Sequence, residues 1–337
     1  MSVVAFDADV LGRRRTGDET YAVNLLRELG ALAESAGIRL VAVTRRPELV
    51  PEGVEPFELP AHWQELRMAW SLPRALRRLD AELVHTQHAL PLRLACPAVV
   101  TVHDVSFERE PELMPRKDRL VFRRVVPRAV RAAARVLTVS ERTKRDLVEL
   151  YGVDPDKVVV TPNGVDPAFS PGPGRHDYVL AVGAIQTRKN QLAALAAASE
   201  VGLPLVVAGP EKDRRLADEL RGRGARLEGY VTTERLAELY RGAACLVQAS
   251  RFEGFGLPVV EAMASGTPVV AVSDAALVEV AASAAVFVDE DALADGIRTA
   301  LADRERLSAV GLERARAFSW RASAEATLRV YREILAE

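Results

Sequence analysis

Residues 244–264 read ACLVQASRFEGFGLPVVEAMA, and this stretch decides the fold. The apolar run 244–249 predicts a buried strand. Gly254 and Gly256 allow a tight turn, and Pro258 suits the first turn of a helix. A buried strand that leads directly into a helix is typical of a parallel sheet, because parallel strands need a crossover connection. The sequence therefore predicts an α/β fold at this point.

The same alternation of short apolar runs and helix-length segments extends in both directions. One series of strands is predicted at 2–8, 38–44, 83–86, 97–103, 134–140 and 158–161. A second series is predicted at 178–184, 204–209, 225–229, 244–249, 268–272 and 285–288. Helices are predicted at 18–35, 115–134, 141–151, 189–199, 211–222 and 233–241. Two such series indicate two Rossmann-like, doubly wound domains, each a parallel sheet covered on both faces.

A boundary between the two domains is legible at 162–174, which holds four prolines and three glycines. Such a segment continues neither a helix nor a central strand. We therefore expect an N-terminal domain at 1–165 and a C-terminal domain at 175–318. A last helix, 319–337, opens at Ser319, a residue suited to a helix N-cap.

Composition excludes several classes of protein. Of the 337 residues, 49% are apolar and the formal net charge is only −2, so no basic field indicates a nucleic-acid partner. Cys96 and Cys245 lie in apolar, strand-like stretches, and we expect both to be reduced core residues. No secretory signal and no membrane-spanning stretch is recognisable, which predicts a cytoplasmic protein.

The turn after strand 244–249 is the first candidate site. Free N–H groups at the start of the following helix would face an anion, helped by the helix dipole. Glu253 and Glu261 bracket this turn. Carboxylates so close to an anion site are expected to face neutral hydroxyls. Glu261 lies among apolar neighbours, so its carboxylate needs a partner.

Further candidates lie where other strands end. Gly183, Arg188 and Lys189 follow strand 178–182, and the two cations could neutralise a pyrophosphate. His103 ends strand 97–102 in the first domain and could hydrogen-bond a ligand; a structural role is the alternative. Asp104 beside it could serve only to cap or to orient. Gly17 lies in the loop Thr16–Thr20, where the backbone could approach phosphates; an N-cap role for Thr16 or Asp18 is the alternative.

At these residues the chain resembles the retaining GT-B glycosyltransferases of family 4, the mannosyltransferase-like group in particular. The matching motifs are Glu253-Gly254-Phe255-Gly256-Leu257-Pro258 with Glu261, Arg188-Lys189-Asn190, His103-Asp104, Val139-Ser140-Glu141, Asn163-Gly164-Val165-Asp166 and Phe318-Ser319-Trp320. The resemblance implies two domains that face a central cleft and a last helix that crosses back to the first domain.

The resemblance also implies roles for individual residues. Arg188 and Lys189 bind the donor diphosphate, Glu253 contacts the transferred sugar, Glu261 holds the ribose, and His103 contacts the sugar from the N-terminal domain. The remaining donor-binding positions are Gly17, Gly183, Val231 near the base, and the turn residues Gly254, Phe255, Gly256 and Leu257. The implied catalytic residues are His103, Glu253, Arg188 and Lys189.

The implied reaction moves a sugar, first of all mannose from GDP-mannose, to a glycan or lipid-linked acceptor with retention at the anomeric carbon. We expect no metal and no cofactor besides the GDP- or UDP-sugar substrate, because Asp7-Ala8-Asp9 has no visible cation-binding partners. The first loop departs from the family, since Asp18 and Glu19 stand where a cation is common.

Two other classes remain open on the residues alone. A nucleotide-cofactor oxidoreductase would need a third glycine where Val259 stands, and a periplasmic-type sugar-binding protein would need a secretory signal. Peripheral membrane contact is also open. The basic amphipathic segments 62–78 and 116–135 could dock on anionic lipid; the alternative is a solvated helix whose aromatic side lies in the core.

Overall fold

The computed structural model describes residues 1–13, 16–60 and 63–336. The chain forms two compact units. Unit 1 comprises Met1–Gly164 together with Trp320–Glu337, and unit 2 comprises Val165–Ser319. Each unit contains one parallel sheet with helices packed on it, which confirms the predicted pair of doubly wound α/β domains.

Unit 1 is built on a sheet of seven parallel strands in the order β3-β2-β1-β4-β5-β6-β7. The strands are β1 (Ser2–Asp7), β2 (Ile38–Thr44), β3 (Glu55–Glu58), β4 (Leu83–Gln87), β5 (Ala98–Val102), β6 (Arg135–Thr138) and β7 (Val158–Val160). Its helices are α1 (Thr16–Ala33), α2 (Gln64–Leu66), α3 (Leu72–Arg78), α4 (Ser106–Arg109), α5 (Arg116–Ala132), α6 (Glu141–Tyr151) and α14 (Trp320–Ala336). The order reverses between β1 and β4, and ligands bind α/β sheets at such a switch point.

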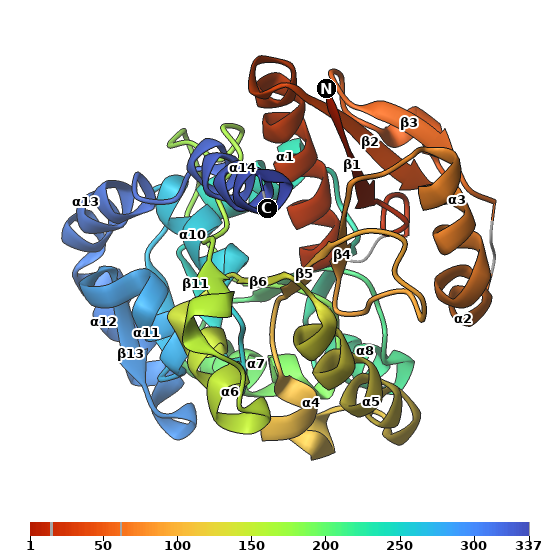
Figure 1. Ribbon diagram of the computed structural model, residues 1–337. Coiled ribbons are helices and arrows are strands. Elements are labelled where there is room, and N and C mark those ends of the chain that lie inside the picture. Colours follow the sequence, from red (N-terminus) through yellow and green to blue (C-terminus); the bar gives the residue numbers. More distant parts are fainter. Residues whose placement is uncertain (14–15, 61–62, 337) are drawn as a thin grey trace. The chain divides into compact units, whose positions relative to one another are not determined.

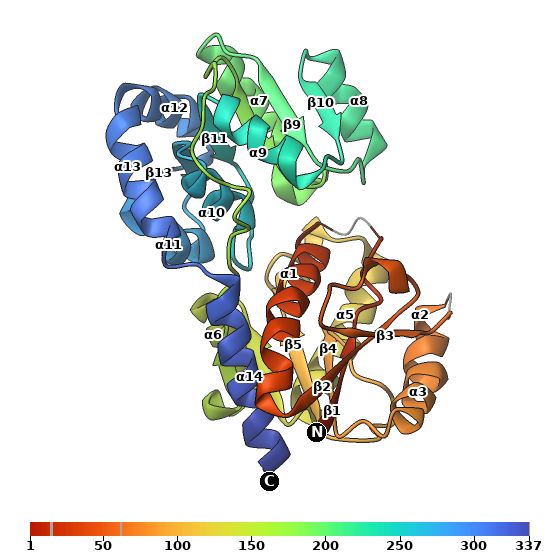
Figure 2. The same ribbon diagram turned by 90° about the horizontal axis from the view of Figure 1, so that it is seen from above.

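The last helix, α14, belongs to unit 1 although unit 2 precedes it in the sequence. Both views show α14 running alongside α1 (Figures 1 and 2). The rings of Tyr21 and Trp320 meet edge to face with centroids 6.2 Å apart. Tyr331 on α14 hydrogen-bonds His85 on the central strand β4. The helix therefore completes the core of unit 1.

Unit 2 is built on a sheet of six parallel strands in the order β10-β9-β8-β11-β12-β13. The strands are β8 (Val179–Val182), β9 (Leu205–Ala208), β10 (Arg226–Gly229), β11 (Cys245–Gln248), β12 (Val269–Val272) and β13 (Ala285–Val288). The helices are α7 (Gln191–Glu200), α8 (Arg214–Gly222), α9 (Thr233–Gly242), α10 (Leu257–Ala264), α11 (Ala275–Ala281), α12 (Leu293–Ala302) and α13 (Arg304–Ala315). The switch point lies between β8 and β11, the two strands that lead into the predicted cationic and glycine-rich turns.

Three details differ from the sequence predictions. The edge strand β3 was not predicted, since its sequence Glu-Pro-Phe-Glu carries a proline that only an edge tolerates. Helix α1 begins at Thr16, so Gly17 and Asp18 lie in its first turn and not in a loop; the side chain of Thr16 is outside the described part. Cys96 is free but lies half-buried in a loop, whereas Cys245 is a buried core residue as predicted.

Candidate active site

The cationic end of β8 is arranged by a glycine. Arg188 and Lys189 lie in the single 3-10 turn Thr187–Lys189 that follows β8. Gly183 has a φ of +134°, and a Cβ at this position would lie 3.3 Å from Cε of Lys189. The missing side chain thus lets the lysine stem fold back over the strand end.

Both cations lie at the Glu253 carboxylate. Lys189 Nζ donates to Glu253 Oε1 at 2.5 Å, and Arg188 Nη1 lies 3.5 Å from Oε2 and donates to the Phe252 carbonyl. Gln248 Nε2 donates to the same Oε1 at 2.6 Å. Burial alone raises the pKa of Glu253, but the neighbouring Lys189 and Arg188 charges outweigh it and lower the pKa to about 2. Glu253 is therefore a fixed anion that accepts hydrogen bonds.

The glycine-rich turn delivers the start of α10 to the same place. Gly256 adopts a φ of +101°, and a Cβ there would lie 2.5 Å from Cδ2 of Leu277, so only glycine fits. Pro258 occupies the first turn of α10, and no acidic residue lies in that turn. Because the first N–H groups of a helix have no intrahelical acceptor, this end can bind an anion.

Glu261 lies one turn into α10 and is buried, and Tyr240 on α9 is its partner. The Tyr240 hydroxyl donates to Glu261 Oε2 at 2.8 Å. Burial raises the pKa of Glu261 to about 7, against the lowering effect of that hydrogen bond, and the Asp166 charge raises it further. Glu261 is thus an acceptor whose charge is easily lost, suited to neutral hydroxyls and unsuited to phosphate oxygens.

In unit 1, His103 follows β5 as predicted. Its Nε2 lies 2.7 Å from Oε1 of Gln87, and its ring packs edge to face on Tyr21 with centroids 4.6 Å apart. Burial lowers the pKa of His103 to about 4, so the imidazole is neutral at pH 7. Asp104 accepts hydrogen bonds from the backbone N–H and the hydroxyl of Ser106, the first residue of α4, whose N-cap residue is Val105.

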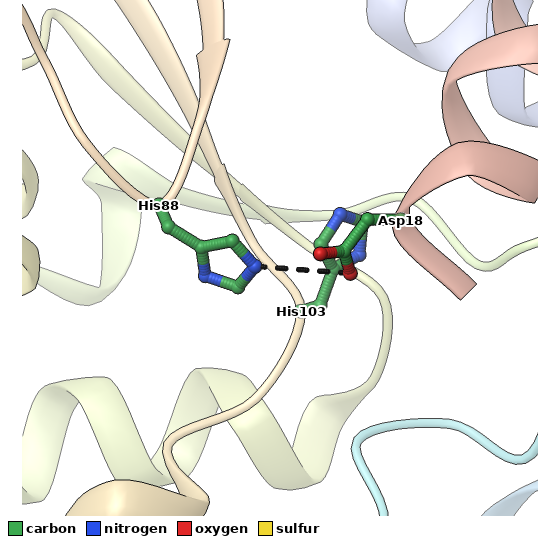
Figure 3. A group of neighbouring side chains, drawn as sticks. All are labelled: Asp18, His88 and His103. Atoms are coloured by element: carbon green, nitrogen blue, oxygen red, sulfur yellow. Dashed lines mark ion pairs between the residues drawn. The ribbon is translucent and has the colours of Figure 1, made fainter. Parts of the chain in front are cut away.

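Asp18 and His88 lie beside His103. His88 follows β4, and its Nε2 is 3.9 Å from Asp18 Oδ1, as Figure 3 shows. Among the described residues, these three side chains are the group of His, Cys, Asp or Glu spaced closely enough to hold a metal ion. Gly17 lies next to them, and among the described residues no heavy atom beyond its chain neighbours and its own helix backbone lies within 4 Å of where its Cβ would be.

The carboxylates of Asp7 and Asp9 are engaged by arginines. The buried Arg67 forms a bidentate ion pair with Asp7, with Nη2 2.7 Å from Oδ1 and Nη1 2.9 Å from Oδ2. Arg45 Nε donates to Asp9 Oδ1 at 2.8 Å, and Arg13 also contacts Asp9. The cationic partners of both aspartates are therefore arginine side chains of the same unit, and these ion pairs fix the end of β1.

The fold brings most of the predicted residues of unit 2 to one place. Gly183, Arg188, Lys189, Glu253 and the turn 254–257 gather at the ends of β8 and β11, with Glu261 behind them. Val231 lies apart, half-buried in the loop after β10. The residues missed are Gln248, Tyr240, Gln87 and His88. Gln87 ends β4, His88 follows it and Gln248 ends β11, so the strand-end rule could have found them. Tyr240 lies in the last turn of a helix and gave no signal.

One surface of unit 1 contradicts an alternative considered above. One interpretation of segment 62–78 places its aromatic side chains in the core. His62 of this segment lies outside the described residues. Trp63, Leu66 and Trp70 are instead 71%, 57% and 58% exposed. These side chains and Arg74, whose guanidinium lies 5.2 Å from the centre of a Trp70 ring, form a surface that we call the Trp patch.

Comparison with known proteins agrees with this geometry. The family model "Glycosyltransferase Family 4" matches residues 15–169, and the model "Glycosyl transferases group 1" matches residues 166–316. O-antigen chain mannosyltransferase B of Escherichia coli is 31% identical over 87% of this chain and 83% of its own length. A D-inositol 3-phosphate glycosyltransferase of Kribbella flavida is 29% identical over 98% of this chain and 95% of its own length.

Solved structures show the same fold. Sucrose-phosphate synthase from Thermosynechococcus elongatus superposes with a TM-score of 0.81 at 20% identity, covering 100% of both chains. An Anabaena protein, HepE, in complex with UDP and glucose superposes with a TM-score of 0.74 at 16% identity, covering 98% of this chain and 99% of its own. The fold and the two matched domains define a GT-B glycosyltransferase. The chain belongs to glycosyltransferase family 4. This membership excludes the two alternatives, an oxidoreductase and a sugar-binding protein.

Proposed function

We propose that this glycosyltransferase transfers mannose from GDP-mannose, with retention at the anomeric carbon, to a glycan or lipid-linked acceptor. The observation that carries the proposal is the convergence of Arg188, Lys189 and Glu253 at the start of α10, with Glu261 one turn inside. Two cations and a helix N-terminus therefore lie next to two carboxylates that can accept hydrogen bonds from hydroxyl groups. Such a set matches a diphosphate flanked by two sugars.

The diphosphate is proposed to lie against Arg188, Lys189 and the N–H groups of 255–257. As the bond between sugar and phosphate breaks, negative charge grows on the leaving diphosphate. Two cations and a helix start stabilise that charge without a metal ion, and preorganised donors of this kind lower barriers most where charge develops. We therefore propose a metal-independent reaction, with the nucleotide sugar as substrate and no further cofactor.

The remaining roles follow the chemistry of each group. Glu253, held ionised by Lys189, accepts from hydroxyls of the transferred sugar. Glu261 accepts from the ribose, and Gly183, Gly254 and the open position at Gly17 let the backbone approach the donor. His103 is proposed to contact the sugar, and Val231 to lie near the base. Retention then follows from attack on the face that the leaving phosphate vacates, with the phosphate taking the acceptor proton.

Mannose and GDP are proposed because two relatives are named as O-antigen chain mannosyltransferases, from Escherichia coli and Salmonella typhimurium. A panel of GDP- and UDP-sugars, assayed for hydrolysis and transfer in the presence of EDTA, tests the donor and the metal requirement together. Release of GDP from GDP-mannose alone supports the proposal. Strict dependence on an added divalent metal, or an inverted product anomer in the NMR spectrum, contradicts it.

We also propose peripheral membrane contact through the Trp patch, at the cytoplasmic face where a lipid-linked acceptor would lie. No helix within 1–13, 16–60 and 63–336 has both the length and the apolar character to cross a bilayer. Leu92, which is 62% exposed, adjoins the same segment, since its backbone N–H donates to the Met68 carbonyl. Arg128 donates to the Leu92 carbonyl at 2.8 Å, which brings the basic helix α5 alongside.

Exposed tryptophans within a basic surface are typical of proteins that dock on anionic lipid. Co-sedimentation with anionic vesicles at low salt is expected for the wild type and lost in Trp63→Ser/Trp70→Ser. Leu301→Ser, an exposed apolar residue of unit 2, is the matched control. Equal binding by the double variant and the control would refute this surface.

A further inference from the structure

We propose that Asp18, His88 and His103 form a binding site for one divalent transition-metal ion, of which Zn²⁺ is the best fit. One ligand atom from each residue lies within 4.8 Å of the other two. Figure 3 shows the three side chains converging from separate segments of unit 1. This site goes beyond the transfer reaction, which needs no metal in the function proposed above.

The topology of the sheet brings the three residues together. His88 and His103 directly follow β4 and β5, which are parallel neighbours, so both imidazoles leave the sheet at the same edge. Asp18 lies in the first turn of α1, the helix that follows the other neighbour of β4, strand β1. The segments that follow three adjacent parallel strands therefore each supply one potential ligand.

The hydrogen bond of His103 prepares it as a ligand. Gln87 Oε1 can only accept, so the 2.7 Å contact assigns the ring proton of His103 to Nε2 and leaves the lone pair on Nδ1. Histidines that bind metals usually donate their other ring N–H to an oxygen in this way, which fixes the ring and its tautomer. Gln87 thus supplies the outer partner that a metal site requires.

The three ligand atoms lie within 4.8 Å of one another and must draw closer to bind an ion. Bonds of about 2.1 Å in a tetrahedral site place ligand atoms about 3.4 Å apart. His88 Nε2 and Asp18 Oδ1 are 3.9 Å apart, and the Asp18 side chain is 40% exposed, so its carboxylate has room to close the difference. The rings are held by aromatic neighbours, His88 by Phe122 at 5.5 Å and His103 by Tyr21 at 4.6 Å between centroids.

The ligand set selects the kind of ion. Two imidazoles with one carboxylate suit Zn²⁺, Ni²⁺, Co²⁺ or Fe²⁺, whereas Mg²⁺ and Ca²⁺ prefer oxygen ligands. Three protein ligands leave a fourth position for water. A bound ion would also occupy the lone pair of His103, so we expect Zn²⁺ to inhibit transfer; this consequence, unlike the binding itself, rests on the proposed function.

Calorimetric titration of Zn²⁺ into the full chain, freed of metal by a chelator and without any nucleotide sugar, tests the site. One Zn²⁺ per chain is expected. Asp18→Asn and His88→Asn should each weaken binding by about tenfold or more, which is about 1.4 kcal/mol. His88 has a φ of +59°, a conformation that asparagine tolerates, so His88→Asn preserves the backbone.

The matched control is His176→Asn. His176 lies in unit 2, also has a φ of +59°, and is outside the cluster, so Zn²⁺ binding should be unchanged. Gln87→Leu should weaken Zn²⁺ binding by about 10- to 100-fold through the loss of the outer partner. Binding that is absent in the wild type, or equal in His88→Asn and His176→Asn, would overturn the proposal. Because the titration uses no donor, its failure leaves the proposed transfer reaction untouched.

Discussion

The charge of Glu261 offers a sensitive test of how the nucleotide is held. Its pKa is raised to about 7 from a usual value near 4.5, mainly because the carboxyl is buried. If the ribose hydroxyls donate to the carboxylate, the ionised form binds better than the protonated form, because hydrogen bonds to a charged acceptor are stronger. Between about pH 7.5 and about pH 5.5 the ionised fraction of such a group falls about 25-fold, and donor affinity should fall by up to this factor.

The assay is calorimetric binding of GDP-mannose across this range. An intact nucleotide sugar is needed because its phosphates are both esterified and do not titrate there, unlike the terminal phosphate of GDP. In Glu261→Gln the side-chain carbonyl still accepts from a hydroxyl but no longer titrates, so affinity should vary little with pH. A wild-type profile as flat as that of the variant would refute the ribose contact.

Stability should change with pH in the opposite sense. The folded state binds the Glu261 proton more tightly than the unfolded state, so this residue's contribution to the free energy of unfolding is largest below the unfolded pKa. It falls by about 1.4 kcal/mol per pH unit as the pH rises from 4.5 towards 7. Urea unfolding of the wild type and Glu261→Gln across this range measures the difference in slope. Equal slopes would mean that the pKa of Glu261 is not raised.

Further substitutions test the rest of the unit 2 site, with Gly17 of unit 1 as a comparison. Arg188→Ala or Lys189→Ala should lower turnover by about 10²–10³. The double variant Lys189→Ala/Glu253→Gln should recover the stability that Lys189→Ala loses, but not the turnover. Wild-type turnover in both single variants would rule out the role of the two cations. Glu253→Gln should bind GDP at least as tightly as the wild type, because the cations no longer share a carboxylate, yet transfer slowly; a large loss of GDP affinity would contradict this. Gly256→Ala should lower the unfolding free energy by about 1–3 kcal/mol through strain and the contact with Leu277, whereas Gly17→Ala should leave it within about 0.5 kcal/mol. Thermal unfolding of both glycine variants is the check, and equal melting temperatures would refute the reasoning.

The fold was predictable because its signals are local. Buried parallel strands appear as short β-branched runs, and the prediction for β2 and α6 matches the structure residue by residue. The edge strand β3 escaped because three of its four residues are exposed, which removes the apolar run that marks a buried strand. The start of α1 was placed two residues late because Gly17 is a poor helix former, a local preference that the packing of α1 overrides.

The candidate site was only partly predictable. Strand ends identify Arg188 and His103, since position along the chain is enough to place them. The partner of Glu261 could not be predicted, because Tyr240 lies in the last turn of α9 and meets α10 only after both helices pack. The exposure of Trp63 and Trp70 was equally hidden, since an apolar stripe on a helix looks the same whether it faces a core or a membrane.

The central claim is that Arg188, Lys189 and the start of α10 hold a diphosphate. Its most direct test is a calorimetric comparison of guanosine, GMP and GDP binding to the wild type and to Arg188→Ala/Lys189→Ala. We predict that the second phosphate improves wild-type affinity by about tenfold or more, and that the double variant loses this gain while still binding guanosine. A gain from GMP to GDP that is the same in both proteins would contradict the claim.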